Sequence, residues 1–562
     1  MEEGINMPNP DGIPLGVTDV TNDTPLNTLL NRVVAEVKTY SSELTSQLKK
    51  LSDIGRALSA EKNLNKLLAM IVEHACNFTR ADGGTLYLLK DDKLHFKIVH
   101  NKSQGIQMDE ESDIASRFPP IELIESNVSA YVAIHGKPVN IADVYNSKLF
   151  DFTGPKKFDK ANNYRSKSML VIPMKNHEDD VIGVLQLLNA QDHEGQNVAP
   201  FSPEFEHLTE SLASQAAIAV SNVNLINDIE KLFESFVEVM AKAIDEKSPV
   251  TGGHIRRVTK LTMVMAEVVN DKKEGVFQKH NFSPENFYEL KIAAWMHDIG
   301  KVTTPVEIIE KSKKLQTICD RIHLVDLRLK YVIQNIKLEG LGKKISLLDK
   351  RGSPDAIKTL EGDIQKKVDG LSDIREFVLK CNEPGEFLED EKVERLEQIQ
   401  QMTFLDSDGK ETHFLTKDEL KNLSIRKGSI TEEERQIMQN HAAITLEMLK
   451  KIPFTKKLKN IPLFAAAHHE CLDGSGYPLG LKEDEIPFEG KLMAVTDIAE
   501  ALTASDRPYK KSMPLEKVHK ILRSMVKNRQ LDHDLVELFI NDNIYQKYLG
   551  QAGPDKSKGL AT

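Results

Sequence analysis

Seven side chains of the kinds that bind transition metals are scattered through one part of this chain. They are His254, His297, Asp298, His441, His468, His469 and Asp497. Taken singly, such a histidine is more often a surface or core residue than a metal ligand. Together, imidazole nitrogens and carboxylate oxygens suit ions such as iron, manganese, cobalt or nickel. Seven ligands exceed the need of one open catalytic ion and fit two ions that share a bridging aspartate. If they act together, the fold has to bring distant segments to one place.

The region that carries these residues is predicted to be mainly helical, from about residue 238 to 543. Segment 316–422 differs, because it contains two separate apolar stripes with glycines between them, at Gly340, Gly342 and Gly352. We interpret it as a helical hairpin inserted between two parts of one helical domain, 246–315 and 423–545. A lid, a dimer arm and a partner-docking element are alternative roles for the hairpin.

The N-terminal half has a different pattern. Short runs with alternating and β-branched residues predict strands, which are expected at Thr85–Leu89, Leu94–Val99, Ser168–Ile172 and Val181–Leu187. Helical segments flank these runs, so residues 61–222 are predicted to form one α+β domain.

Long helices are predicted on both sides of this domain, an amphipathic one at 23–60 and a connecting one at 223–245. In the second, apolar residues follow at spacings of three and four, namely Ile226, Ile229, Phe233, Phe236 and Met240. This spacing fits a coiled-coil seam and also a surface helix packed on its own domain. Residues 1–22 are expected to be disordered, and 546–562 to form a tail.

Composition limits the function classes. The 562 residues carry a formal net charge of −11, which argues against DNA binding because phosphate neutralisation needs a basic face. The N-terminus lacks the features of a secretory signal, and no stretch approaches the roughly 18 apolar residues of a membrane helix. Four scattered cysteines form no disulfide framework. A cytoplasmic protein without a membrane partner is therefore expected.

Two local sequences connect the histidines to a known family. His297-Asp298-Ile299-Gly300-Lys301 resembles the signature of HD-type phosphohydrolases. The stretch from His468 to Pro478, HHECLDGSGYP, matches the signature HHExxDGxGYP of the HD-GYP subfamily without a substitution. The segments around His254 and Asp497 also match, so the chain is identified as resembling an HD-GYP protein.

The resemblance implies a metal-dependent phosphodiesterase that hydrolyses cyclic di-GMP to pGpG and often onward to GMP. It assigns all seven residues above as metal ligands. Two transition-metal ions are expected, and iron and manganese are the favoured metals. Catalytic roles fall to Asp298 and Lys301, and substrate contacts to Lys301, Tyr477, Arg507 and Lys510. Hydrolysis of another cyclic dinucleotide, such as cyclic GMP-AMP, and a catalytically weak receptor or scaffold are the alternatives.

Two departures from the family pattern matter. Some members hold a third metal with a glutamate four residues before the first ligand histidine, where this chain has Val250. A two-metal site is therefore predicted. The second departure is the insertion at 316–422, which splits a Lys-rich turn between 311–315 and 426–430. Within it, Asp406-Ser407-Asp408-Gly409 is interpreted as a plain turn in preference to a calcium loop.

The α+β domain resembles a GAF domain through segments such as 81–89, 136–145 and 167–174. A pattern of cyclic-nucleotide-binding GAF domains is incomplete, since Ala190 and Phe205 replace its lysine and aspartate. The expected fold is thus an α+β GAF sensor domain followed by an all-α HD-GYP domain, joined by long helices. The GAF domain is expected to bind an unknown small ligand or to serve dimerisation alone, and a parallel homodimer through both long helices is predicted.

Overall fold

The computed structural model describes residues 24–109, 118–192, 197–247, 252–385, 387–504 and 513–551. The chain divides into two units, one ending at Lys231 and the other beginning at Leu232. Among the described residues, no helix combines the length and the apolar character needed to cross a bilayer. The predicted disorder of 1–22 lies outside the described residues.

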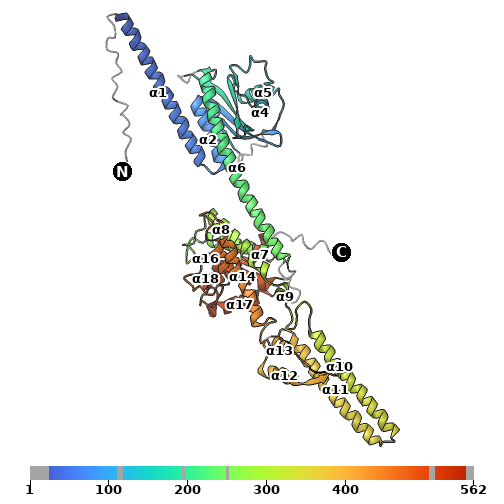
Figure 1. Ribbon diagram of the computed structural model, residues 1–562. Helices are drawn as coiled ribbons and strands as arrows, with labels where there is room; N and C mark the ends of the chain where they lie inside the picture. Colours follow the sequence, from blue (N-terminus) through green and yellow to red (C-terminus); the bar gives the residue numbers. More distant parts are fainter. Residues whose placement is uncertain are drawn as a thin grey trace, which may run out of the picture. The chain divides into compact units, whose positions relative to one another are not determined.

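The first unit is built on one antiparallel sheet (Figure 1). Its strands run in the order β3-β2-β1-β7-β6-β5, with β4 beside β2 and β8 beside β7. The strands are β1 Ala81–Lys90, β2 Lys93–Asn101, β3 Ile106–Met108, β4 Ile121–Glu122, β5 Val139–Ile141, β6 Met169–Lys175, β7 Val181–Gln191 and β8 Val198–Ala199. The four strands expected from the alternating runs correspond to β1, β2, β6 and β7, so the α+β prediction is confirmed.

Helices pack on both faces of this sheet. On one face, α2 (Leu64–Thr79) shares a core with residues of α1 (Thr24–Ala60) and α6 (Pro203–Asp245). Gly84 allows the close approach, because a Cβ there would lie 2.8 Å from Cys76 Sγ. On the other face, α4 (Val128–His135) packs against β6 and β7. The next helix along the chain is α5 (Thr153–Asn162).

Helix α6 contains the predicted connection. It runs without a break from Pro203 to Asp245, so the predicted connecting helix 223–245 continues a helix that begins inside the first unit. Phe233 and Met240 pack against the core of the second unit, and Phe233 meets the ring of Phe454 at 6.5 Å. They are therefore not members of an open seam, because the second unit already covers them.

The second unit is helical around a core of its own. Its main helices are α7 His254–Asp271, α8 Pro284–Met296, α9 Val306–Ile309, α14 Glu432–Lys450, α15 Ile461–Ala466, α16 Phe488–Thr503, α17 Leu515–Lys527, α18 His533–Asn541 and α19 Ile544–Gln551. Two short 3-10 helices, η3 (Ile299–Thr303) and η4 (Ala467–His469), join them. The predicted tail is shorter than expected, because α19 continues to Gln551.

The insertion forms an arm with a separate core, defined here as residues 316–422. It contains α10 (Ile322–Asp349), α11 (Pro354–Asn382), α12 (Asp390–Gln401), α13 (Lys417–Leu423) and a two-stranded hairpin, β9 Thr403–Leu405 with β10 Glu411–His413. The predicted break at Gly340 and Gly342 is wrong, because both lie inside α10. A Cβ at Gly340 would lie 2.2 Å from Ile364 Cδ1, so this glycine lets α10 and α11 pack closely.

The turn at 406–409 joins the two strands of that hairpin. Asp406 accepts hydrogen bonds from the backbone N–H groups of Asp408 and Lys410, and Gly409 has a φ of +76°. The two ends of the arm meet at its root, where Ser429 donates a hydrogen bond to the backbone oxygen of Lys311. The split Lys-rich turn is thereby rejoined in space.

Candidate metal centre

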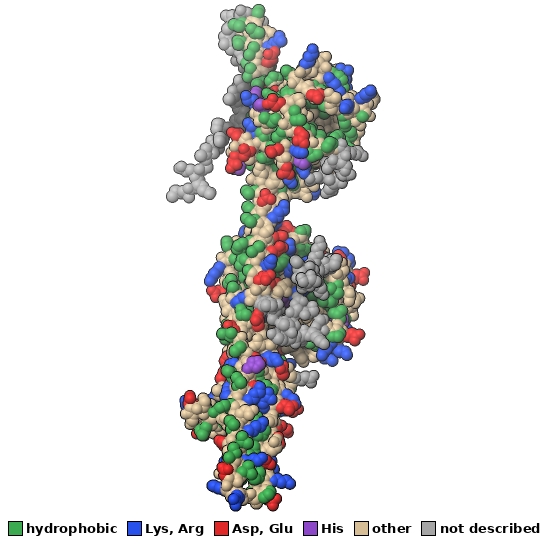
Figure 2. Space-filling view, turned by 90° about the vertical axis from the view of Figure 1, so that its right-hand side faces the viewer, with side chains coloured by type: hydrophobic (Ala, Val, Ile, Leu, Met, Phe, Trp, Pro, Cys, Tyr) green, Lys and Arg blue, Asp and Glu red, His purple; other side chains and the backbone are tan. Residues whose placement is uncertain are grey.

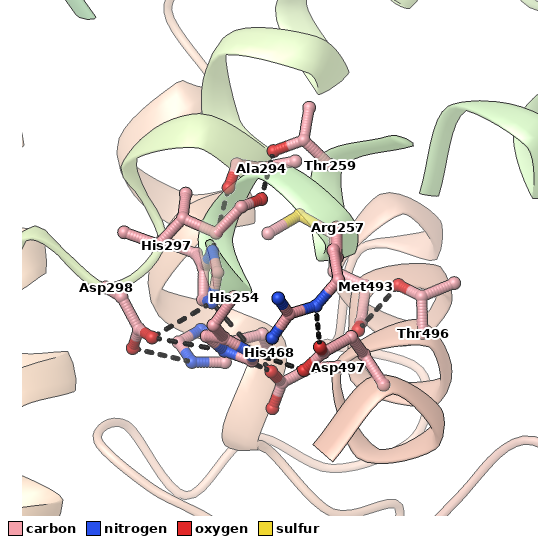
Figure 3. Close-up of polar contacts among 12 residues, drawn as sticks. His254, Arg257, Thr259, Ala294, His297, Asp298, His468, Met493, Thr496 and Asp497 are labelled. Atoms are coloured by element: carbon pink, nitrogen blue, oxygen red, sulfur yellow. Dashed lines mark hydrogen bonds and ion pairs between the residues drawn. The ribbon is translucent and has the colours of Figure 1, made fainter. Parts of the chain in front are cut away.

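All seven predicted ligands lie together in the second unit, although they come from five places in the chain. His254 begins α7, and His297 and Asp298 lie where α8 passes into η3. His441 lies on α14, His468 and His469 lie on η4, and Asp497 lies on α16. Figure 3 shows His254, His297, Asp298, His468 and Asp497 turned toward one another. The fold thus brings all seven predicted ligands together from distant segments.

Backbone carbonyls fix the orientation of three of the histidine rings. The Nδ1 atoms of His297, His441 and His468 lie 2.8, 2.5 and 2.6 Å from the carbonyl oxygens of Ala294, Met438 and Ala465. This contact requires the proton on Nδ1 and leaves Nε2 with a lone pair. The three Nε2 atoms are buried and have no hydrogen-bond partner among the described residues. Because a buried polar atom without a partner is costly, this arrangement indicates a bound cation.

Two carboxylates lie between the histidines. One group of possible ligands consists of His254, His297 and Asp298, and the other of His441, His468 and His469. Asp298 reaches both groups, since its Oδ2 lies 3.3 Å from His297 Nε2 and its Oδ1 lies 3.3 Å from His441 Nε2. Asp298 therefore lies between the two groups of possible ligands.

Asp497 completes the first group. Its Oδ1 lies 3.1 Å from His254 Nε2 and 3.9 Å from His297 Nε2. Asp497 therefore faces the same space as Asp298 from the opposite helix, α16.

The ionisation of the cluster suits a cation. Burial lowers the pKa of His469 to about 3 and that of His468 well below its usual value, so both rings are neutral. Burial opposes the charge of Asp298, but Lys301 and His297 outweigh it and hold the pKa of this carboxyl well below its usual range. Burial also opposes a charge on His254, yet the carboxylates around it raise its pKa, which shows that this position favours positive charge.

Lys301 lies beside the cluster as predicted. Its Nζ is 2.5 Å from Asp298 Oδ2, and its side chain is mostly buried. The turn that carries it is held by Lys247, whose Nζ donates to the backbone oxygens of Lys301, Val302 and Thr304. The ammonium group is therefore positioned at the edge of the metal centre.

Two supporting residues were missed by sequence reasoning. Glu500 Oε2 contacts His254 Nδ1 at 2.5 Å, and its other oxygen accepts from Arg257 Nε (the guanidinium in Figure 3). Thr445 accepts from the N–H of Gly300 and donates to the backbone oxygen of His297. Glu500 follows Asp497 by three positions on one helix, which is the signal that places both on the same face.

The GYP segment forms one wall of the centre. The Tyr477 ring lies 4.8 Å from the ring of His469. Glu470 accepts hydrogen bonds from the backbone N–H groups of Leu479 and Leu481, which holds the segment in place. A Cβ at Gly476 would lie 2.3 Å from the nitrogen of Cys471, so only glycine fits there. Arg507 and Lys510, the other predicted substrate contacts, lie outside the described residues, as does Val250.

The first unit contains a second candidate site, a cavity of about 380 Å³. It is lined mainly by apolar and aromatic residues, and the described lining includes His100 and Asp151 but no lysine or arginine. Gln186 Oε1 accepts from the Tyr87 hydroxyl at 2.8 Å and from the Ser129 hydroxyl at 3.2 Å. Its amide nitrogen reaches only the sulfur of Met169, at 3.7 Å, among the described residues. The cavity thus offers a buried amide donor to a neutral ligand.

Comparison with known families agrees with this division of the chain. Residues 63–220 match the family model of the GAF domain, and residues 417–535 match that of the HD domain. The chain contains a GAF domain and an HD domain. The HD match includes four of the seven ligands, while His254, His297 and Asp298 precede it and join the site only through the fold.

Several curated proteins share part of this sequence. A cyclic di-GMP phosphodiesterase of Thermotoga maritima is 37% identical over 122 residues, covering 21% of this chain and 31% of that protein. The 3'3'-cGAMP-specific phosphodiesterase 3 of Vibrio cholerae is 42% identical over 96 residues, covering 17% of this chain and 20% of that protein. The chain spans less than a third of the length of these two relatives.

Among solved structures, a GAF domain from an Acinetobacter phosphoenolpyruvate-protein phosphotransferase matches the chain at 17% identity and a TM-score of 0.25. The match covers 33% of this chain and 98% of that one.

Proposed function

We propose that this protein is a metal-dependent phosphodiesterase that hydrolyses cyclic di-GMP to pGpG under the control of its GAF domain. The observation that carries the proposal is the pair of ligand groups in the HD domain, with Asp298 between them and three buried Nε2 atoms directed inward. The shared sequence with cyclic di-GMP phosphodiesterases supports the choice of reaction.

The residues fit two transition-metal ions, with iron or manganese as the expected metals. His254, His297, His441, His468 and His469 would hold them together with Asp497, and Asp298 would bridge the two. When bound, such ions supply the positive charge that clamps a phosphodiester and makes water nucleophilic at neutral pH. The neutral rings of His468 and His469 and the ionised carboxylate of Asp298 are in the protonation states that metal binding requires.

The chain's own side chains position the substrate. Lys301, held 2.5 Å from Asp298, places an ammonium group where negative charge grows on a phosphoryl oxygen. Tyr477 lies over His469 and offers an aromatic face to a guanine. Arg507 and Lys510 are proposed to bind the phosphates from the segment that follows α16. Continued hydrolysis to GMP is a second step at the same site.

Turnover by the purified full chain tests this function. The protein is loaded anaerobically with iron or manganese, supplied with cyclic di-GMP, and the products are separated by chromatography. Formation of pGpG that is lost in the Asp298→Ala variant supports the proposal. Tight binding without turnover by either metal form would favour a receptor, the alternative function. Faster turnover of 3'3'-cyclic GMP-AMP, the substrate named for some relatives, would reassign the substrate.

The GAF domain is proposed to bind a small, neutral and largely apolar ligand in its cavity. Gln186 supplies a buried amide donor, and the absence of lysine and arginine from the described lining disfavours a phosphorylated ligand. Asn189, which belongs to the incomplete cyclic-nucleotide pattern, has its side-chain amide bonded to the backbone. Its Oδ1 accepts a hydrogen bond from the N–H of Lys167, and its Nδ2 donates one to the oxygen of Arg165. Dimerisation alone remains the alternative role of this domain.

A cytoplasmic, parallel homodimer through α1 and α6 is the proposed assembly. Apolar side chains of α1 remain exposed at Leu29, Val33 and Val37, with Tyr40 beyond them. On α6 the exposed apolar row consists of Leu225, Ile229, Leu232, Phe236 and Val239. This row replaces the seam first expected, and its spacings of four and three are those of a coiled coil. A monomer mass in light scattering would contradict the assembly.

A further inference from the structure

Helix α10 of the arm carries an apolar seam that faces solvent. Between Leu324 and Leu348, residues spaced alternately three and four positions apart are all exposed, over more than three heptads. Seven of the eight positions are apolar or aromatic. In order, the eight are Leu324, Leu327, Tyr331, Gln334, Leu338, Leu341, Ile345 and Leu348. Hydrophobic side chains also follow the length of the arm in Figure 2. We call these eight residues the α10 seam.

This seam is not the face that packs inside the arm. Val325, Leu329 and Ile333 are buried in the arm core against α11, and Ile336 packs against the same core. On a helix with 100° per residue these positions lie opposite the α10 seam. The Tyr331 ring of the seam lies 6.4 Å from the ring of Phe404 in the arm. The helix is therefore apolar on two faces, of which the fold covers one.

The exposure of the seam is large. Leu327, Leu338 and Leu341 expose 60%, 65% and 56% of their surface. The seam extends over 25 residues, or about 37 Å of helix. A contiguous apolar strip of this size marks an interaction surface. An apolar heptad repeat sustained over more than three heptads is typical of a coiled coil, in which the partner is another helix with the same repeat.

The charges beside the seam identify that partner and its direction. Lys330, Lys337 and Lys344 directly precede Tyr331, Leu338 and Ile345, while the other flank carries Arg328, Asn335, Gly342 and Asp349. In an antiparallel pair of α10 helices the lysines would face lysines. In a parallel pair they face Asn335, Gly342 and Asp349 of the second copy, and Lys344 meets a carboxylate. Gln334 then lies opposite its own copy and fixes the register, as polar core residues do in coiled coils.

We infer that the arm is a dimerisation element, in which the α10 seam forms a parallel, in-register coiled coil with α10 of a second copy of this chain. The inference goes beyond the proposed phosphodiesterase and does not depend on its activity. It also differs from the assembly through α1 and α6, because it uses another surface on another part of the chain. Its occupant is the same protein, since a second copy of α10 carries the same repeat and places Asp349 beside Lys344.

Disulfide trapping in the full chain tests this pairing. Exposed Cys319 is first replaced by serine, and Leu341→Cys is then introduced in the seam. Glu339→Cys, on the same helix but off the seam and also exposed, is the matched control. In a parallel pair the two Leu341→Cys thiols meet across the axis at an effective concentration near ~1 mM, so at ~1 µM protein we expect crosslinking at least ~100-fold faster than for the control. Adding Leu338→Glu should abolish this advantage.

Each possible result of the crosslinking experiment supports or overturns the inference. Equal crosslinking of Leu341→Cys and Glu339→Cys overturns the inference, even if α1 and α6 hold the chains together, because that tether raises both rates alike. Crosslinks between a Leu327→Cys chain and an Ile345→Cys chain, with none at Leu341→Cys, would mean antiparallel pairing and overturn it too. Unchanged thermal melting of the reduced Leu341→Cys variant shows that the protein is folded.

Discussion

Replacement of Gly300 by alanine tests whether the two ligand groups depend on one close backbone contact. In the structure a Cβ at this position would lie 2.0 Å from the carbonyl oxygen of His441 and 2.8 Å from the nitrogen of Thr445. Non-bonded heavy atoms need about 3.5 Å, so η3 and α14 would have to separate by roughly 1.5 Å. His297 and Asp298 lie on one side of this contact and His441 lies on the other.

The expected loss follows from this displacement. A misplacement of about 1 Å in a catalytic site costs on the order of 100-fold in rate, so kcat of Gly300→Ala should fall by at least that factor. Overpacking of this kind also costs roughly 1–3 kcal/mol of stability. Steady-state turnover of cyclic di-GMP, the metal content of the purified protein and thermal melting measure the three effects. We expect the variant to bind less metal than the wild type.

Gly370→Ala is the matched control. Gly370 lies exposed in α11, and no atom would come within 4 Å of an added Cβ. Alanine is favoured over glycine in a helix by about 0.5–1 kcal/mol, so this variant should be as active as the wild type and at least as stable. Wild-type turnover and metal content in Gly300→Ala would refute the reasoning, since the contact would then not set the spacing of the ligands.

Three further outcomes are expected. Asp298→Ala should abolish turnover and reduce bound metal, measured by elemental analysis, and a variant that keeps both ions and the wild-type rate would contradict the bridging role. Glu500→Gln should weaken metal affinity about 10–100-fold by loosening His254, and a competition titration with a chelator measures this; an unchanged titration would remove Glu500 from the metal centre. Chelation should lower the melting temperature of the HD domain, because a ligand at 100 times its Kd stabilises the folded state by about 2.7 kcal/mol; identical melting of the chelated and metal-loaded protein would show that no ion contributes to stability.

The metal centre was largely predictable because its residues occur in ordered local sequences. The His297-Asp298 pair and the HHECLDGSGYP stretch contain four of the seven predicted ligands, and the matching segments around His254 and Asp497 add two more. The fold brings these residues together. Glu500 was also within reach of sequence reasoning, since it shares a helix face with Asp497. Thr445 was not, because its role depends on how closely α14 approaches η3, and no local pattern specifies that distance.

Helix packing was less predictable than helix position. The spacing of Phe233 and Met240 fitted a seam, but periodicity does not say which partner covers an apolar face, and these two residues pack on the HD core. The glycines at 340 and 342 were expected to break the arm. Both remain helical. At Gly340, α11 packs so closely that a side chain would not fit, whereas an added Cβ at Gly342 would meet no atom within 4 Å. Tertiary contact outweighed the weak helix propensity of glycine in this case.

The rejoined turn at the root of the arm has a consequence for synthesis on the ribosome. His254, His297 and Asp298 emerge first, and the arm of residues 316–422 separates them from the remaining four ligands. Because α10 and α11 are neighbours in sequence and share a core, the arm can fold while the first half of the HD domain still lacks its second half. Translation adds about 5–20 residues per second, so Asp497 emerges roughly ten seconds or more after the first half of the HD domain. His254 and His297 lack the helices that bury them throughout this interval, so the candidate metal centre forms only after the whole domain has been translated.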